Sequence, residues 1–118
     1  MSGIEQLAHQ LIIRIYTSQQ LGQVAAVLET MAANPDFKSH ARQIATDPHM
    51  PSNLKTQQLT ALFKNINLPI VTKFFTEMFS QQQFWIFSSD QFDYFDEFVQ
   101  KFQMQVHQVV IVYMAVAN

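Results

Sequence analysis

Residues 92–106 read FDYFDEFVQKFQMQV, and this stretch decides the class of fold. Its apolar residues recur every three or four positions, a spacing that places them on one face of an α-helix. They are Phe92, Phe95, Phe98, Val99, Phe102 and Val106. Just upstream, Ser88, Asp90 and Gln91 form a capping-box pattern, which is typical of a helix N-terminus. The sequence therefore predicts a long amphipathic helix that begins near Ser88.

Five more segments upstream follow the helical period, at about residues 2–16, 18–32, 35–46, 52–66 and 69–79. Thr17, Ser18 and Asn34 are polar residues of the kind that cap helix N-termini, and Pro35 suits a first helical turn. The chain has only two glycines and four prolines, too few for the frequent turns of a sandwich or barrel. We predict a compact, all-α bundle of six helices over residues 1–106.

The final segment, residues 107–118, reads HQVVIVYMAVAN and differs from the helices before it. Residues 109–113 are all β-branched or aromatic, and such side chains favour strands over helices. We therefore expect a strand-like apolar tail. A single strand leaves backbone donors and acceptors unpaired, and no second strand is evident in this chain.

The composition excludes several classes of function. The chain of 118 residues has no cysteine, so it offers no disulfide, no thiolate zinc site and no cysteine nucleophile. Seven basic against nine acidic residues give a net charge of −2, without the basic excess of a nucleic-acid-binding domain. The longest apolar run, residues 109–117, is shorter than the roughly 20 residues of a membrane-spanning helix. We expect neither nucleic-acid binding nor membrane insertion, and the first residues resemble no signal or transit sequence.

No catalytic motif is recognisable in the sequence. The four histidines are scattered, and no serine lies in a nucleophile-elbow context. One carboxylate cluster, Asp90, Asp93, Asp96 and Glu97, offers oxygen ligands for a divalent cation, which keeps a small metal-dependent enzyme as one hypothesis. These acids interleave with the phenylalanines of the same helix, so the simpler interpretation makes them its solvated face. We predict no enzyme activity, no metal and no cofactor.

The first and fifth predicted helices carry more apolar surface than one core face needs. The first has Ile12 and Ile13 beside its main stripe. The fifth has two neighbouring stripes, one of Val71, Phe74 and Met78 and the other of Phe75 and Phe79. Two such helices, lying side by side, would form a groove for an amphipathic helix of a partner.

The order of these features resembles the N-terminal domain of the δ subunit of F-type ATP synthases, the family of the mitochondrial oligomycin-sensitivity-conferring protein. The resemblance covers nearly the whole chain as a pattern of apolar residues and prolines. It includes Leu21-x-x-Val24-x-x-x-Leu28, Asn34-Pro35-Asp36-Phe37, Pro48-x-x-Pro51-x-x-x-Lys55 and Phe74-Phe75-x-x-Met78. The chain lacks the family's opening Ala-Arg-x-Tyr-Ala pattern, and it has Gln81-Gln82-Gln83-Phe84 where the family usually has an arginine.

The resemblance implies a non-catalytic stator subunit that takes part in proton-driven ATP synthesis. In the family, the bundle sits on the catalytic head, binds N-terminal helices of the α subunits and joins the head to the b subunit of the peripheral stalk. Such a subunit would lie on the cytoplasmic face of a bacterial membrane or on the matrix side of the mitochondrial inner membrane. Residues 107–118 would then lead into a C-terminal part that is absent from this chain and that makes most of the stalk contact.

The resemblance places the α-subunit groove between the first and fifth helices. The residues that it assigns are Leu7, Leu11, Phe75 and Phe79 for the groove, with Arg14 and Glu77 at its rim. One alternative stays open. The chain would then be a free-standing helical interaction module that associates with itself through its apolar surface and residues 109–113.

Overall fold

Six α-helices and no strand make up the part of the chain that the structure describes, residues 3–89 and 91–117, with side chains described as far as residue 109. In this computed structural model the helices are α1 (Gly3–Ile12), α2 (Ser18–Ala32), α3 (Pro35–Thr46), α4 (Ser52–Leu62), α5 (Pro69–Ser80) and α6 (Tyr94–Ala117). Two short 3₁₀ helices, η1 (Lys64–Ile66) and η2 (Trp85–Phe87), follow α4 and α5. The predicted all-α fold of six helices is confirmed.

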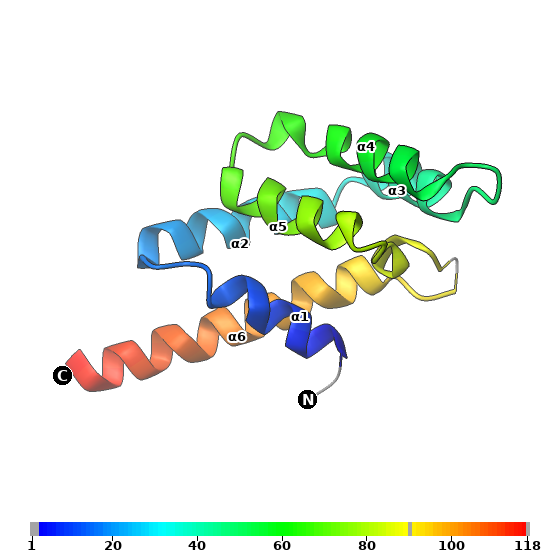
Figure 1. The fold of residues 1–118 in the computed structure, drawn as a ribbon. Helices are drawn as coiled ribbons and strands as arrows, with labels where there is room; N and C mark the ends of the chain where they lie inside the picture. Colours follow the sequence, from blue (N-terminus) through cyan, green and yellow to red (C-terminus); the bar gives the residue numbers. More distant parts are fainter. Residues whose placement is uncertain (1–2, 90, 118) are drawn as a thin grey trace.

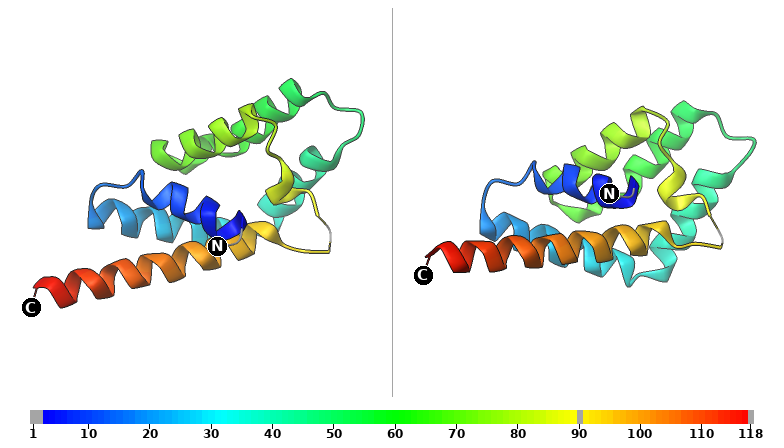
Figure 2. Two further views of the ribbon diagram at one scale, coloured as in Figure 1. Left: turned by 60° about the horizontal axis from the view of Figure 1, so that its bottom comes forward. Right: turned by 90° about the horizontal axis from the view of Figure 1, so that it is seen from below.

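The helices form two groups, with α1, α2 and α6 in one and α3, α4 and α5 in the other (Figure 1). On one side α1 and α2 pack against α6, while α4 packs against α5 and α3. The segment η2 contacts both α3 and α6, so it joins the two groups. The last turns of α6 extend beyond the other helices in both views of Figure 2, and the molecule is accordingly 56 Å long but no more than 28 Å across.

Two helix starts follow the predicted capping chemistry. The Thr17 side-chain oxygen accepts a hydrogen bond from the backbone amide of Gln20 at 3.1 Å, which caps α2. The Asn34 side-chain oxygen accepts one from the amide of Phe37 at 3.1 Å, and Pro35 occupies the first turn of α3. Each cap satisfies an amide that the helix itself leaves without a partner.

The predicted start of the last helix near Ser88 is wrong, because α6 begins at Tyr94. One of its N-terminal amides is satisfied by Asp93, whose Oδ1 accepts a hydrogen bond from the amide of Asp96 at 3.0 Å. The Ser89 hydroxyl instead accepts hydrogen bonds from the amides of Gln91 and Phe92, both at 3.2 Å, ahead of the helix. Phe92, predicted to lie on the buried stripe, precedes the helix and is 59% exposed.

The predicted strand over residues 107–118 is also wrong, because α6 continues as a helix through Ala117. Residue 118 lies outside the described part. Extending an established helix adds one hydrogen bond per residue, whereas β-branched residues lower helix stability by only a few tenths of a kcal/mol each. A lone strand would leave those backbone groups unpaired. Among the described residues, no helix has both the length and the apolar character needed to cross a bilayer.

Phenylalanines fill the centre of the molecule. Phe75 of α5 stacks on Phe63, with ring centroids 4.8 Å apart, and meets Phe98 of α6 edge-on at 5.7 Å. Six phenylalanines are less than 2% exposed: Phe63, Phe75, Phe79, Phe95, Phe98 and Phe102. Aromatic pairs at these distances add to the free energy that burial supplies. The cluster therefore fixes the orientation of α5 relative to α4 and α6.

Phe75→Ala should lower the free energy of unfolding by about 3–5 kcal/mol, because it leaves a cavity among rings that cannot collapse around it. Urea denaturation followed by circular dichroism measures the change. Phe92→Ala is the matched control and should cost less than about 1 kcal/mol, since that ring is mostly exposed. Equal losses in the two variants would contradict the central role of Phe75.

Candidate functional site

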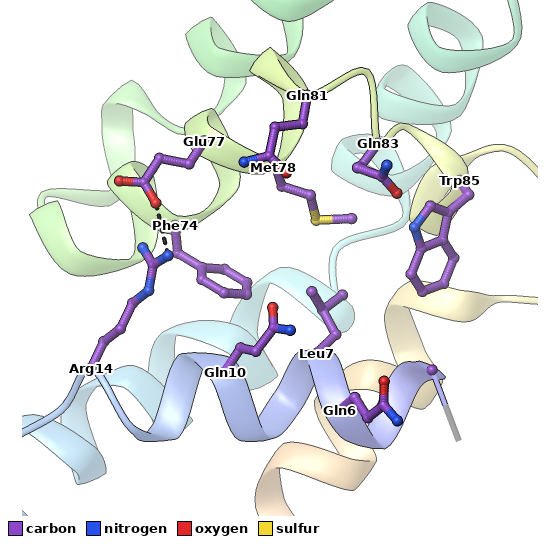
Figure 3. A pocket seen from close by; sticks show the side chains of 11 residues that line it. Gln6, Leu7, Gln10, Arg14, Phe74, Glu77, Met78, Gln81, Gln83 and Trp85 are labelled. Atoms are coloured by element: carbon purple, nitrogen blue, oxygen red, sulfur yellow. Dashed lines mark ion pairs between the residues drawn. The ribbon is translucent and has the colours of Figure 1, made fainter. Parts of the chain in front are cut away.

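A groove that encloses about 280 Å³ runs between α1 and α5 (Figure 3). Gly3, Gln6, Leu7, Gln10 and Arg14 line it from α1 and the turn that follows. Phe74, Glu77, Met78, Gln81, Gln83 and Trp85 line it from α5 and the segment up to η2. Two stretches that are far apart in the sequence, residues 3–14 and 74–85, thus share one surface.

The groove exists because α1 and α5 are each held by a different neighbour. On α1, Ala8 and Leu11 are completely buried, and the Gln105 side chain of α6 donates a hydrogen bond to the carbonyl oxygen of Glu5 at 3.0 Å. On α5, the Thr56 hydroxyl of α4 donates to the carbonyl oxygen of Phe79 at 2.9 Å. The sides of α1 and α5 that face each other are therefore left to line the groove.

The floor of the groove is apolar. Phe74 is 3% exposed and Met78 is 7% exposed, so both present only a small part of their surface. Figure 3 shows the half-buried Leu7 side chain pointing toward these two residues, with Trp85 at one end of the groove. The Trp85 ring meets Tyr94 edge-on at 5.9 Å, which fixes its position at the start of α6.

An ion pair crosses the other end of the groove. Arg14 Nη2 lies 2.8 Å from Glu77 Oε2, and the Arg14 guanidinium lies over the Phe74 ring, 5.1 Å from its centroid. Both charged side chains are about two-fifths exposed, at 39% and 42%. A pair this accessible to water contributes at most about 1 kcal/mol to stability. The pair therefore acts mainly by linking the turn after α1 to α5 and by neutralising both charges.

The predicted groove residues divide between this surface and the core. Leu7, Arg14 and Glu77 lie in the groove, whereas Leu11, Phe75 and Phe79 are completely buried and do not line it. In this structure those three side chains belong to the core, and their assignment to a partner's binding site stays a prediction. Successive helical residues point about 100° apart, so the stripe of Phe75 and Phe79 faces the aromatic core, and the neighbouring stripe of Phe74 and Met78 faces α1.

Sequence reasoning missed the residues at the end and along the rim of the groove. Trp85 belongs to η2, a segment for which the periodicity predicts no element. Gln81 and Gln83 follow α5 in a glutamine-rich stretch that gives no helical pattern. A usable signal is that Trp85 is the only tryptophan of the chain and lies two residues after this polar stretch.

The acidic cluster is an ion-pair site that joins α3 to α6. Lys38 Nζ lies 3.0 Å from Asp93 Oδ2 and 3.0 Å from Asp96 Oδ2. The prediction of a purely solvated face therefore needs correction, since α3 supplies a cation to these acids. Asp90 lies outside the described residues. Within the described part, no three histidine or acidic side chains are grouped as a metal site requires.

The two charges stabilise each other. Burial disfavours the charge on Lys38, but hydrogen bonds and attraction to Asp93 and Asp96 raise its pKa above the ordinary 10.5. Burial likewise acts against the charge on Asp93, yet the backbone amide of Asp96 and the Lys38 ammonium lower the pKa of Asp93 below 3.8. The pair is thus fully charged across the neutral range, and it ties α3 to the first turn of α6.

Lys38→Met should lower the free energy of unfolding by about 1–2 kcal/mol, the usual cost of removing a partly buried hydrogen bond between charged groups. Because the folded-state pKa of Asp93 is lowered, its stabilisation is present above pH 4 and is lost as the pH falls through that pKa. Because the pKa of Lys38 is raised, its contribution persists up to at least pH 10. Urea denaturation at several pH values should therefore show a constant difference in the free energy of unfolding between Lys38→Met and the native chain from about pH 5 to 9. This difference should shrink below about pH 4.

Lys73→Met on α5 is the control, because Lys73 is exposed and lies near the N-terminal end of its helix as Lys38 does. Its effect should be small and independent of pH. A Lys38→Met effect that stays constant down to pH 2 would contradict the ion-pair interpretation.

Comparison with protein-family models, with curated proteins and with solved structures gives no significant match to this chain.

Proposed function

We propose that the chain is a non-catalytic stator subunit of an F-type ATP synthase. In this role it binds the N-terminal helix of an α subunit in the groove between α1 and α5, and it helps to join the catalytic head to the b subunit of the peripheral stalk. The stalk contact belongs mostly to a C-terminal part that follows the bundle in that family. The proposal starts from the resemblance in sequence pattern, and one structural observation supports it.

That observation is the position of the groove. The resemblance assigns the partner's helix to the surface between the first and fifth helices, and the structure has a groove between α1 and α5. Leu7, Arg14 and Glu77, assigned from the sequence, all line it.

The length of the groove matches about three turns of a helix. Its α1 side runs from Gly3 to Arg14, which at about 1.5 Å per residue corresponds to roughly 16 Å, or three helical turns. An amphipathic helix laid in such a groove places apolar residues at helical spacing against the floor. The chemistry also favours binding over catalysis, because among the described lining residues the one carboxylate, Glu77, is already paired with Arg14.

A synthetic peptide of the N-terminal helix of the cognate α subunit should bind with 1:1 stoichiometry. Since Trp85 lines the groove and is the only tryptophan, a shift of its emission on titration locates binding to this surface. Leu7→Asp should weaken binding by at least about tenfold, because it places a carboxylate at the apolar floor. Gln10→Tyr should also weaken binding by narrowing the groove, and it alters an exposed side chain.

Ile13→Asp is the matched control for Leu7→Asp, because it introduces the same charge directly after α1 at a side chain that is 60% exposed and outside the groove. It should leave binding unchanged. The absence of saturable binding, or equal losses in Leu7→Asp and Ile13→Asp, would rule out the proposed function. Circular dichroism confirms that each variant is folded.

A second candidate function, self-association of a free-standing helical module, is favoured by a separate apolar surface. Ile12, Ile15, Tyr16, Leu21 and Val109 help to line a hollow of about 370 Å³ where the turn between α1 and α2 meets α6. Residues 15–28 and 102–118 contain no lysine, arginine, aspartate or glutamate. In a symmetric dimer the same surface of each copy faces its counterpart, so a surface without charged residues avoids repulsion between like charges.

If the chain is such a module, light scattering should show a dimer that dissociates on dilution, and Tyr16→Asp should shift it to monomer. Tyr16 is 89% exposed, so this change leaves the core intact. Leu54→Asp, at an exposed apolar residue on α4, is the control. A monomer at every concentration would remove this candidate.

A further inference from the structure

The groove between α1 and α5 is electrically neutral along its rim. Four of its lining residues are glutamines: Gln6, Gln10, Gln81 and Gln83. Arg14 and Glu77 are its only charged lining residues in the described part of the chain, and they neutralise each other at 2.8 Å. We propose, on the basis of the helix-binding function above, that the groove selects a partner helix whose apolar stripe is flanked by uncharged polar side chains.

The rim of the groove loses contact with water when a helix covers the floor. A helix seated on Phe74 and Met78 removes water from the side chains on either side of its apolar stripe. A lysine or glutamate in that flank loses hydration and meets an amide instead of an opposite charge, which is unfavourable. A glutamine, asparagine, serine or threonine there both donates and accepts hydrogen bonds, as the glutamine amides of the rim do.

The ion pair strengthens this selection. Arg14 is held both by Glu77 at 2.8 Å and by the Phe74 ring at 5.1 Å, so a carboxylate on the partner gains less from it than from an unpaired guanidinium. Glu77 is likewise already paired, so a partner's lysine gains little from it. Among the residues that the structure describes, the groove thus has no unpaired charge to attract a charged flank.

The apolar residues inside the groove determine which apolar side chains the partner must carry. Leu7, Met78 and Trp85 border the hollow at one end, and methionine side chains adapt readily to the shape of what they contact. The inferred partner is therefore a helix of about three turns with large aliphatic or aromatic anchors and a neutral polar flank. Binding to it should depend little on ionic strength, because charge attraction contributes little.

The test uses three synthetic peptides of the α-subunit N-terminal helix, all without tryptophan. They share their apolar residues and carry glutamine, lysine or glutamate at the flanking positions. Trp85 emission gives Kd for each at about 0.01 M and about 1 M salt, a range over which the screening length falls from about 30 Å to about 3 Å. The Kd of the glutamine peptide should change by less than about threefold between the two salt concentrations. At low salt each charged peptide should bind roughly tenfold more weakly than the glutamine peptide.

A charge introduced at the rim should reverse the preference. Gln81→Glu places a carboxylate at an exposed position of the groove, so it should strengthen binding of the lysine peptide at low salt and lose that gain at high salt. Gln57→Glu, at an exposed position of α4 outside the groove, is the control and should change nothing.

The outcomes separate this inference from the proposed function. If a charged peptide binds the native chain as tightly as the glutamine peptide while Leu7→Asp still abolishes binding, the neutral selection is overturned and the helix-binding function stands. If none of the three peptides binds, both are overturned. Strong salt dependence of the glutamine peptide also overturns the inference, because it requires charges that the rim does not supply.

Discussion

The packing of Phe75 between Phe63 and Phe98 is the interaction on which the rest of the structure depends. It fixes the rotation of α5 about its own axis, because two flat rings accept a third in few orientations. With Phe75 and Phe79 committed to the core, the neighbouring stripe of α5 must point toward α1. The groove floor of Phe74 and Met78 is thus a direct consequence of how the aromatic core is filled.

The position of Trp85 and α1, which border the rest of the groove, depends on where α6 begins. Asp93 both caps α6, through the amide of Asp96, and pairs with Lys38 of α3. These contacts fix the first turn of α6 against α3, and that turn carries Tyr94, against which Trp85 rests. Further along, α6 holds α1 through buried apolar contacts and the bond from Gln105 to Glu5. An electrostatic contact on one side of the molecule therefore contributes to the shape of a groove on another side.

The sequence was sufficient to predict the helices, because periodicity and caps such as Asn34 are local signals. It was not sufficient to choose between the two stripes of α5, since both are apolar and the choice is made by partners distant in the sequence, such as Phe63 and Phe98. The strand predicted for residues 107–118 was wrong because β-branched residues disfavour a helix only weakly, and the continuation of α6 outweighs this preference. The ion pairs of Lys38 were missed because its partners, Asp93 and Asp96, lie 55 and 58 positions further along the chain, where no local sequence pattern links them to it.

The groove is open for a mechanical reason. Closing it requires α1 and α5 to approach, but α1 is seated on α6 by buried Ala8 and Leu11, and α5 is seated on α4 by the aromatic core. Either movement exposes apolar surface elsewhere, at about 25 cal/mol per Å², so the bundle gains nothing by collapsing onto its own groove. The Arg14 to Glu77 pair also ties α1 to α5 at one end and limits how far they can separate. A ligand that fitted this surface would meet it already formed, which would lower the entropic cost of binding.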